Sequence, residues 1–243
     1  MTLLLTHVTS LGIVFAADRA IVTQDINGSI LNFLGFKQKI FQLPHLKAGI
    51  GYFGQAVVND VPLDVWLREF IKTQDRSASL FDFASALKNR LENEQRRRLF
   101  GTGFHICGYS DKSPLGREFY FLKNYDTLSD LWANNLTKTY ELRDHLPAYL
   151  PSPPPSGFWA VDLHNGTLSK YNEIMKTKFA ALPVQRGQSR MPKFATSIST
   201  YERYVANIFE QVIRQYRGDA GIAPVNTDNG KPDIFTIPAP QNG

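Results

Sequence analysis

The first twenty residues constrain the fold more than any other part of the sequence. Two segments with strand-like patterns, the mixed residues 2–9 and the mostly apolar residues 13–20, are joined by Ser10-Leu11-Gly12. A short turn between two such segments predicts a β-hairpin. The second segment begins with the uninterrupted apolar run Ile13-Val14-Phe15-Ala16-Ala17, which is typical of a strand buried on both faces. We therefore expect the chain to begin inside the core of a sheet.

Helix and strand patterns follow in blocks along the rest of the chain. Apolar residues recur at helical spacing in residues 61–74, again after Ser79, and at about 199–216. Strands are predicted at 104–109 and 118–122. The order strands, helices, strands, helix, strand predicts an α+β fold and suits a four-layer αββα sandwich. A chain of 243 residues with 43% hydrophobic content is expected to form one domain, 1–243.

Thr2 follows the initiator methionine, and Asp18 directly follows the apolar run that ends at Ala17. A threonine at a free N-terminus carries a nucleophile and a base in one residue, because its hydroxyl can attack a carbonyl while its α-amino group takes the proton. An α-amine titrates near ~7.7 to 8.0 and is largely available as a base around neutrality. Met1 must be removed first, since acylation of the amine abolishes the base. Thr2 is therefore a candidate nucleophile.

Four segments in order along the chain resemble proteasome β-subunits and the bacterial proteasome-like peptidases, which are N-terminal nucleophile hydrolases. These segments are the hairpin with Thr2 and Gly-Ile-Val-Phe-Ala-Ala-Asp-Arg, then residues 37–43, 48–56 and 230–237. The resemblance implies the four-layer αββα sandwich of that class and a threonine-type peptidase. It also implies a polypeptide substrate, a homo-oligomeric ring and a possible separate ATPase unfoldase.

The resemblance implies separate roles for three residues. Thr2 would attack the peptide carbonyl, and Asp18 would hold the lysine. Lys39 would lower the pKa of the α-amine and steady the developing charge. These three form the predicted catalytic set.

Further positions are expected to line the cleft or to assist the reaction. The backbone N–H of Gly54, with Gly51 as a second candidate, would stabilise the oxyanion. Ala20 lies where many family members carry an arginine, and the substrate pocket would depend on it. Ser189 and Asp219 are candidates, by location only, for the accessory residues that orient the amine.

Two regions depart from the family pattern. The chain is longer than usual between Asp18 and Lys39, so residues 30–34 are expected to enlarge a loop near the cleft. Residues of about 124–157 are expected to be an insertion that ends in the stiff connector 151–155. The following segment, 158–168, alternates around an Asn-Gly turn and predicts a hairpin.

Charge and composition argue against several other classes of function. The net charge is +5, and Arg96-Arg97-Arg98 is the one dense basic run. We interpret it as a solvated helix end, so no nucleic-acid partner is expected. The single cysteine, Cys107, fits a reducing compartment, and no spacing of metal ligands or cofactor motif is present. No apolar run approaches the ~20 residues of a membrane span, so a cytoplasmic protein with no membrane partner is expected.

Two other functions stay open from the sequence. The first is a catalytically inactive, ring-forming subunit of the same fold, because no Ser-Gly segment or Asp-x-x-Ser pair stands out as a source of accessory residues. The second is an N-terminal nucleophile amidase that acts on small amides. Turnover of small amides without turnover of polypeptide would distinguish this amidase from a peptidase.

Overall fold

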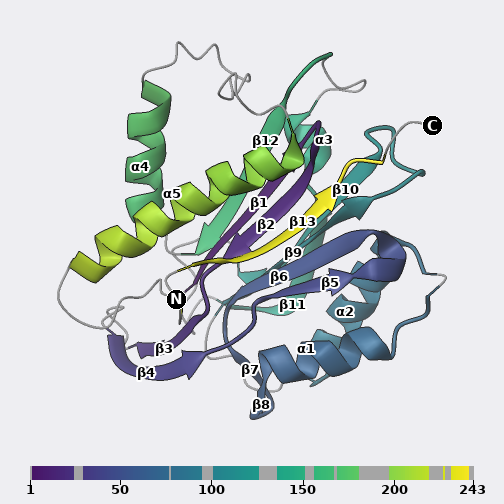
Figure 1. Ribbon diagram of the computed structural model, residues 1–243. Coiled ribbons are helices and arrows are strands. Elements are labelled where there is room, and N and C mark those ends of the chain that lie inside the picture. The colour runs from purple at the N-terminus through teal and green to yellow at the C-terminus, as the bar shows by residue number, and fades with distance from the viewer. Residues whose placement is uncertain are drawn as a thin grey trace. The chain divides into compact units, whose positions relative to one another are not determined.

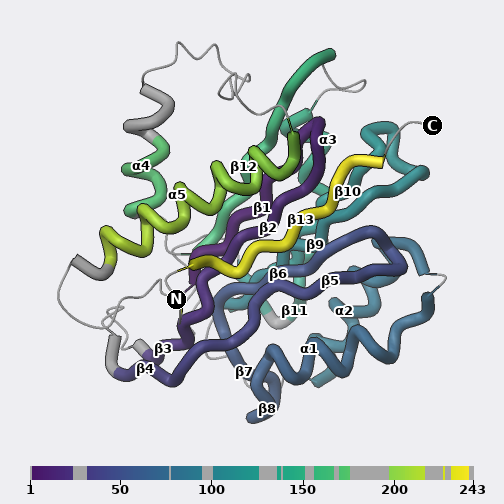
Figure 2. Tube along the Cα trace, viewed as in Figure 1, coloured from purple at the N-terminus to yellow at the C-terminus, as the bar shows by residue number. Residues whose placement is uncertain are grey.

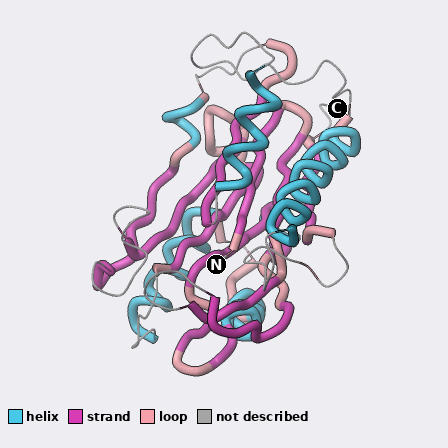
Figure 3. The backbone as a smooth tube through the Cα atoms, turned by 90° about the vertical axis from the view of Figure 1, so that its left-hand side faces the viewer, coloured by secondary structure: helices cyan, strands magenta, loops and turns pink. Residues whose placement is uncertain are grey.

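A computed structural model describes residues 2–24, 30–76, 78–94, 101–125, 136–150, 156–166, 169–180, 197–218, 227 and 231–240. Two compact units divide the chain, residues 1–40 with 149–243 and residues 41–148. Each has an antiparallel sheet and helices, so the α+β class is confirmed (Figure 3). The single domain and the stacking of four layers stay predictions. The basic run 96–98, the connector 151–155, Ser189 and Asp219 lie outside the described residues.

The sheet of the first unit contains the predicted N-terminal hairpin. Its strand order is β12 (Ala160–Gly166), β1 (Leu3–Thr9), β2 (Gly12–Ala17) and β13 (Asp233–Pro238). β1 and β2 pair antiparallel with Leu4 opposite Ala17, and all their residues are buried. Figure 2 shows β13, in yellow from the end of the chain, beside the purple β2.

Two helices of the first unit pack with this sheet. The helix α5 (Ile198–Gly218) contacts β2 and β13, and it also contacts α4 (Ser169–Ala180) (Figure 1). The Oγ atom of Ser197 accepts the N–H of Thr200 at 3.2 Å, which caps the first turn of α5. The buried residues of α5 recur at helical spacing and pack with apolar residues of β1 and β2; they are Tyr201, Val205, Ile208, Phe209, Val212, Ile213 and Tyr216. Burial of each large apolar side chain stabilises the fold by about 1.5 to 3 kcal/mol.

A polar network links both helices to the sheet. The Nδ1 atom of His7 in β1 lies 2.6 Å from the hydroxyl oxygen of Tyr201 in α5. The Tyr171 hydroxyl in α4 donates to Oδ2 of Asp162 in β12 at 2.5 Å. His7 Nε2 lies 3.4 Å from Asp162 Oδ1, so one carboxylate connects the two pairs. The network fixes β1, the strand that begins directly after Thr2.

A separate two-stranded sheet lies between Asp18 and Lys39. It consists of β3 (Ala20–Gln24) and β4 (Ile30–Phe36), which pair antiparallel. The extra length that the sequence predicted as a loop is therefore a hairpin. Two of its apolar side chains are exposed, Phe33 at 39% and Leu34 at 61%.

The second unit is built on a five-stranded sheet. Its order is β11 (Leu136–Asp144), β10 (Arg117–Tyr125), β9 (Thr102–Tyr109), β6 (Ala48–Gly54) and β5 (Ile40–Leu43). The predicted helices are α1 (Leu63–Lys72) and α2 (Leu80–Glu94), and α2 contacts β9, β10 and β11. Ser79 and Asp82 exchange hydrogen bonds at the start of α2, which forms a capping box. The short elements are η1 (Pro44–Leu46), β7 (Val57–Val58), β8 (Val61–Pro62) and α3 (Leu146–Tyr149).

The region predicted as an insertion contains regular structure. Its described part includes β11, which is the edge strand of the five-stranded sheet and pairs with β10. The hairpin predicted for residues 158–168 is wrong. β12 pairs with β1 instead, and the next described element is the helix α4. The Asn165-Gly166 pair ends the strand β12, but the partner of β12 is β1, near the start of the chain.

Among the described helices, none has both the length and the apolar character that crossing a membrane requires.

Candidate active site

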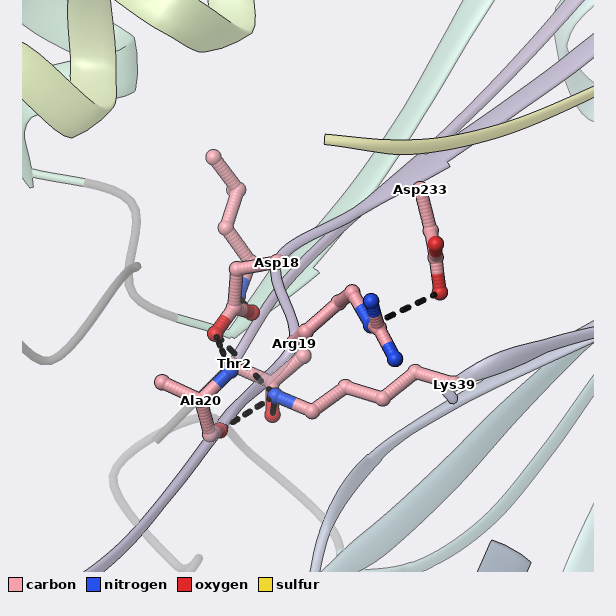
Figure 4. Close-up of polar contacts among 7 residues, drawn as sticks. Thr2, Asp18, Arg19, Ala20, Lys39 and Asp233 are labelled. Atoms are coloured by element: carbon pink, nitrogen blue, oxygen red, sulfur yellow. Dashed lines mark hydrogen bonds and ion pairs between the residues drawn. The ribbon is translucent and has the colours of Figure 1, made fainter. Parts of the chain in front are cut away.

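The ammonium group of Lys39 joins three residues of the first unit. Its Nζ atom donates to Thr2 Oγ1 at 2.8 Å, to Asp18 Oδ2 at 3.1 Å and to the Ala20 carbonyl oxygen at 2.6 Å. Figure 4 shows the Thr2 and Asp18 side chains and the Ala20 carbonyl around the Lys39 nitrogen. An ammonium has three N–H donors, and here each has an acceptor. The predicted residues Thr2, Asp18 and Lys39 therefore lie together, and Ala20 joins them through its backbone.

The pairing of β1 with β2 brings Thr2 and Asp18 together. Thr2 precedes β1 and Asp18 follows β2, so an antiparallel pair of strands sets both residues at one end. The Leu3 N–H donates to Asp18 Oδ1 at 2.9 Å, and the Asp18 N–H donates to the Leu3 carbonyl at 3.3 Å. Asp18 is therefore positioned by the backbone that carries Thr2.

The β3–β4 hairpin separates Lys39 from Asp18 in sequence, and a backbone hydrogen bond at its base brings the two ends together. The Lys37 N–H donates to the Arg19 carbonyl at 2.8 Å, which fixes the segment that leads to Lys39. The Ala20 N–H donates to Asp18 Oδ2 at 3.1 Å. Asp18 consequently accepts two backbone hydrogen bonds as well as the lysine contact.

Because Gly166 has no side chain, the backbone of Thr2 can lie directly beside it. It ends β12, opposite Leu3 of β1, with φ of +100°. A Cβ atom built on it would lie 1.6 Å from the Thr2 carbonyl oxygen. No side chain fits there, so glycine is required on both conformational and steric grounds.

The buried charges of the site shift each other's pKa. Burial lowers the pKa of Lys39, and the adjacent Asp18 carboxylate opposes this shift. Burial likewise raises the pKa of Asp18, against the effect of Lys39 and the hydrogen bond from Leu3. Both side chains are fully buried, at 3.1 Å from one another. The three acceptors around Nζ favour the charged lysine in spite of its burial.

This arrangement polarises the hydroxyl of Thr2. Because Oγ1 accepts a hydrogen bond from a cation, any negative charge that developed on it would be stabilised. The Thr2 side chain is buried, with 4% of the residue exposed. The hydroxyl proton is not used in the contact with Lys39, so an adjacent base can take it.

The two glycines predicted for the oxyanion lie in the second unit. Both belong to β6, where Gly51 pairs with His105 of β9. Gly54 has φ of +90°, and a Cβ on it would lie 1.9 Å from the Gly101 carbonyl oxygen. This close approach explains why a glycine stands at the end of β6. The oxyanion role of Gly54 and Gly51 stays a prediction.

Three contacts at the site have little or no sequence signal. The acceptor at Ala20 is a backbone carbonyl, which every residue carries, and the role of Gly166 depends on a strand far along the chain. Arg19 forms an ion pair with Asp233, in which Nε lies 3.8 Å from Oδ2.

Within the described residues, no three His, Cys, Asp or Glu side chains are grouped so that they could hold a metal ion.

Comparisons with known proteins bear on the family. No protein-family model matches the sequence, and no curated protein matches it. Solved structures that match include Anbu (ancestral beta-subunit) from Yersinia bercovieri, at 9% identity and a TM-score of 0.48, with 98% of this chain and 81% of that chain covered. A second is the Anbu (Gly-1) mutant from Hyphomicrobium sp. strain MC1, at 12% identity and a TM-score of 0.48, with 98% and 88% covered.

These findings correct the sequence-based assignment to the proteasome β-subunits and the bacterial proteasome-like peptidases. That assignment is wrong, because no family model supports it and the structures reported above are Anbu proteins at 9 and 12% identity. The four segments that suggested it are short, and strand and turn patterns of this kind recur in unrelated sequences. A TM-score of 0.48 carries no argument about activity, so the chemistry of the site follows from its own geometry.

Proposed function

We propose that this chain, once Met1 has been removed, is an N-terminal threonine hydrolase that cleaves a peptide bond. The observation that carries the proposal is the contact of Lys39 Nζ with Thr2 Oγ1 at 2.8 Å, with Asp18 at 3.1 Å from the same nitrogen. A buried lysine aimed at the hydroxyl of the second residue suits a nucleophile whose base is its own α-amine.

The reaction would run in two stages. In the first, Thr2 Oγ1 bonds to the carbonyl carbon, its proton passes to the α-amine, and the C–N bond breaks as that proton is delivered to the leaving amine. In the second, water attacks the resulting ester while the α-amine takes a proton from the water. The ester C–O bond then breaks as the α-ammonium returns that proton to Oγ1, which releases a carboxylic acid and restores the Thr2 hydroxyl and the neutral amine. Lys39 would stabilise negative charge on Oγ1 in both stages.

Assembly is a separate part of the proposal. We infer that copies of the chain associate in a homo-oligomeric ring, because Phe33 and Leu34 on the β3–β4 hairpin are exposed apolar side chains that a neighbouring copy could cover. Native mass spectrometry would give the number of copies. A strictly monomeric chain would refute the ring and leave the hydrolase chemistry intact. A polypeptide substrate and a separate ATPase unfoldase stay predictions.

An inactive subunit of the same fold is the second candidate. The hydrogen bonds of Lys39 to Thr2, Asp18 and the Ala20 carbonyl favour it, since they would hold the start of β1 without any substrate. In that case Lys39 would join Thr2 to Asp18 only to stabilise the start of β1. An amidase for small amides is the third candidate, and it differs from the peptidase only in the size of substrate accepted.

The test is the intact mass of the purified chain before and after incubation with a peptide epoxyketone, which reacts with an N-terminal threonine through both its hydroxyl and its amine. We expect a chain without Met1 that gains one inhibitor mass. The Thr2→Ala variant should gain none, and Thr2→Ser should still react because it keeps a hydroxyl beside an α-amine. Small amide and peptide substrates assayed in parallel would distinguish the amidase from the peptidase.

The outcomes separate the candidates. A processed chain that stays unmodified, and that cleaves no substrate faster than Thr2→Ala, would refute the hydrolase and favour the inactive subunit. A preparation that keeps Met1 would be treated with a methionine aminopeptidase and measured again, since only a free Thr2 amine tests the proposal.

A further inference from the structure

A cluster of titratable side chains lies on the sheet of the first unit, outside the proposed active site. His7 of β1 and Asp162 of β12 are opposite one another in the paired strands, and His164 follows two residues along β12. Tyr171 of α4 and Tyr201 of α5 contact the cluster from the two helices. Figure 1 shows α5 running across the strands of this sheet. The cluster therefore joins two strands to both helices.

Three polar atoms at the centre of the cluster lie close together without a hydrogen bond. Asp162 Oδ1 is 3.4 Å from His7 Nε2 and 3.2 Å from His164 Nδ1. All three atoms are buried, and none has a hydrogen-bond partner among the described residues. The other carboxylate oxygen, Oδ2, accepts the Tyr171 hydroxyl at 2.5 Å. Oδ1 is thus an acceptor that two imidazoles face, and it would attract a proton added to either ring.

The surroundings of His7 determine which of its two nitrogens carries the proton. A neutral imidazole has one N–H donor and one acceptor nitrogen. Because Nε2 faces the Asp162 carboxylate, the proton belongs on Nε2, and Nδ1 is left as the acceptor. The hydroxyl oxygen of Tyr201 lies 2.6 Å from Nδ1, so Tyr201 donates its proton to the ring. This hydrogen bond joins α5 to β1.

A second proton on His7 reverses this hydrogen bond. A cationic imidazole donates from both nitrogens, so Nδ1 can no longer accept the Tyr201 hydroxyl. Within the part of the chain that the structure describes, that hydroxyl makes no other hydrogen bond. Tyr201 is 1% exposed, so water does not replace the lost acceptor. A buried donor without a partner is unfavourable, and the contact between α5 and β1 weakens.

Protons can enter the cluster from solvent. The side chains of His164 and Asp162 are 32% and 28% exposed, whereas that of His7 is 3% exposed. Burial lowers the pKa of His7, Asp162 opposes this shift, and His164 adds to it. The phenols of the cluster, including that of Tyr204 in α5, stay neutral because burial raises their pKa. On its other side β1 pairs with β2, which places the apolar Val14 opposite His7.

We propose that His7 and Tyr201 form a pH-sensitive switch, which fastens α5 to β1 while His7 is neutral and loosens α5 when His7 takes up a second proton. Asp162 has two parts in the switch, since it sets the resting tautomer of His7 and stabilises the added charge. The switch goes beyond the proposed hydrolase, because it needs neither a free Thr2 nor a substrate.

Nuclear magnetic resonance of the full chain tests the switch in two steps. The nitrogen shifts of the His7 ring, assigned with His7→Gln, should show the Nε2–H tautomer at about pH 8. Amide hydrogen exchange is then followed from about pH 7 to about pH 5 and corrected for the intrinsic effect of pH on exchange. We expect protection in the first half of α5 to fall roughly 5-fold or more as His7 becomes charged.

Tyr201→Phe removes the hydroxyl and keeps the ring. The titration of His7 should move to higher pH by roughly half a unit or more, because its protonation no longer breaks a hydrogen bond. Protection of α5 should then no longer depend on pH in this window. Tyr171→Phe is the matched control. It loses a hydroxyl from the same cluster but keeps the contact of Tyr201 with His7, so α5 should loosen as in wild type.

Three results would overturn the inference. One is an Nδ1–H tautomer of His7 at about pH 8. Another is an equal loss of α5 protection in Tyr201→Phe and in wild type. The third is a loss of the same size in the five-stranded sheet of the second unit, since that indicates global unfolding and not a local switch.

Discussion

Replacement of Lys39 by methionine tests the buried ion pair of the site directly. Methionine has a similar length without the charge, so Asp18 keeps its N–H donors from Leu3 at 2.9 Å and Ala20 at 3.1 Å but loses its cation. Removing one partner of a buried pair costs about 3 to 5 kcal/mol, because the other charge is left uncompensated. We expect the free energy of unfolding near pH 8 to fall by about that amount, which is a large share of the ~5 to 15 kcal/mol typical of a protein.

The difference in unfolding free energy between wild type and Lys39→Met should shrink as the pH falls. Lys39 holds the pKa of Asp18 down against burial, so in Lys39→Met that pKa rises further. A carboxyl whose pKa is higher in the folded than in the unfolded chain makes the folded state bind protons more tightly. The variant therefore gains stability relative to wild type as the pH falls from the raised value toward ~3.9, the value for an unfolded aspartate.

Urea unfolding followed by circular dichroism at about pH 8 and about pH 5 would measure both effects. Lys37→Met is the control, because Lys37 lies two residues away and only partly buried. Asp18→Asn combined with Lys39→Met removes both charges and should lose less stability than Lys39→Met alone near pH 8. A cost below about 1 kcal/mol, or a cost that does not change with pH, would refute the buried ion pair.

Two further predictions concern residues around the site. Burial lowers the pKa of His7 although Asp162 opposes the shift, so the stability that His7 contributes is present above ~6.5, its value in the unfolded chain, and is lost as the pH falls toward the lower folded value. We expect His7→Gln to flatten the dependence of unfolding free energy on pH across that window. Urea titrations at several pH values would measure it, and the same pH dependence in variant and wild type would contradict the prediction. Gly166→Ala would place a Cβ 1.6 Å from the Thr2 carbonyl oxygen and should reduce epoxyketone modification at least about 10-fold. Gly157→Ala, at φ of +88° with no neighbouring atom within 4 Å, is the control, and equal rates in the two variants would refute the steric argument.

Local patterns predicted the elements that carry clear turn signals or apolar spacing of their own. The hairpin of β1 and β2 and the helices α1, α2 and α5 all lie close to where turn signals and apolar spacing indicated them. The helix α4 and the strands β4 and β11 were missed. The helix α4 packs with α5 and the strand β11 pairs with β10, in both cases across an intervening segment, and such packing overrides weak local preference. The strand β4 pairs with the nearby β3, and its own sequence lacks a clear strand pattern.

The family assignment failed for a related reason. Short runs such as Gly-Ile-Val-Phe-Ala-Ala describe a buried strand, and many unrelated proteins need buried strands. The pairing of a second-residue threonine with an aspartate after β2 and a lysine beyond it was more informative. Asp18 and Lys39 were assigned as partners of Thr2 through the resemblance, and Lys39 does lie within hydrogen-bonding distance of both Thr2 and Asp18 in the folded chain.

The sequence by itself determined which chemical groups are present and where strands and helices can form. Thr2 supplies a hydroxyl next to a potential amine, Asp18 and Lys39 supply opposite charges, and apolar periodicity requires the hairpin to be buried. The tertiary structure alone decided which backbone groups complete the site and which distant residues surround it. The Ala20 carbonyl accepts a hydrogen bond from Lys39, and strand pairing places Gly166 opposite Leu3 and Asp233 opposite Ala17. Strand pairing joins residues without regard to their separation in sequence, so only the folded chain defines those neighbours.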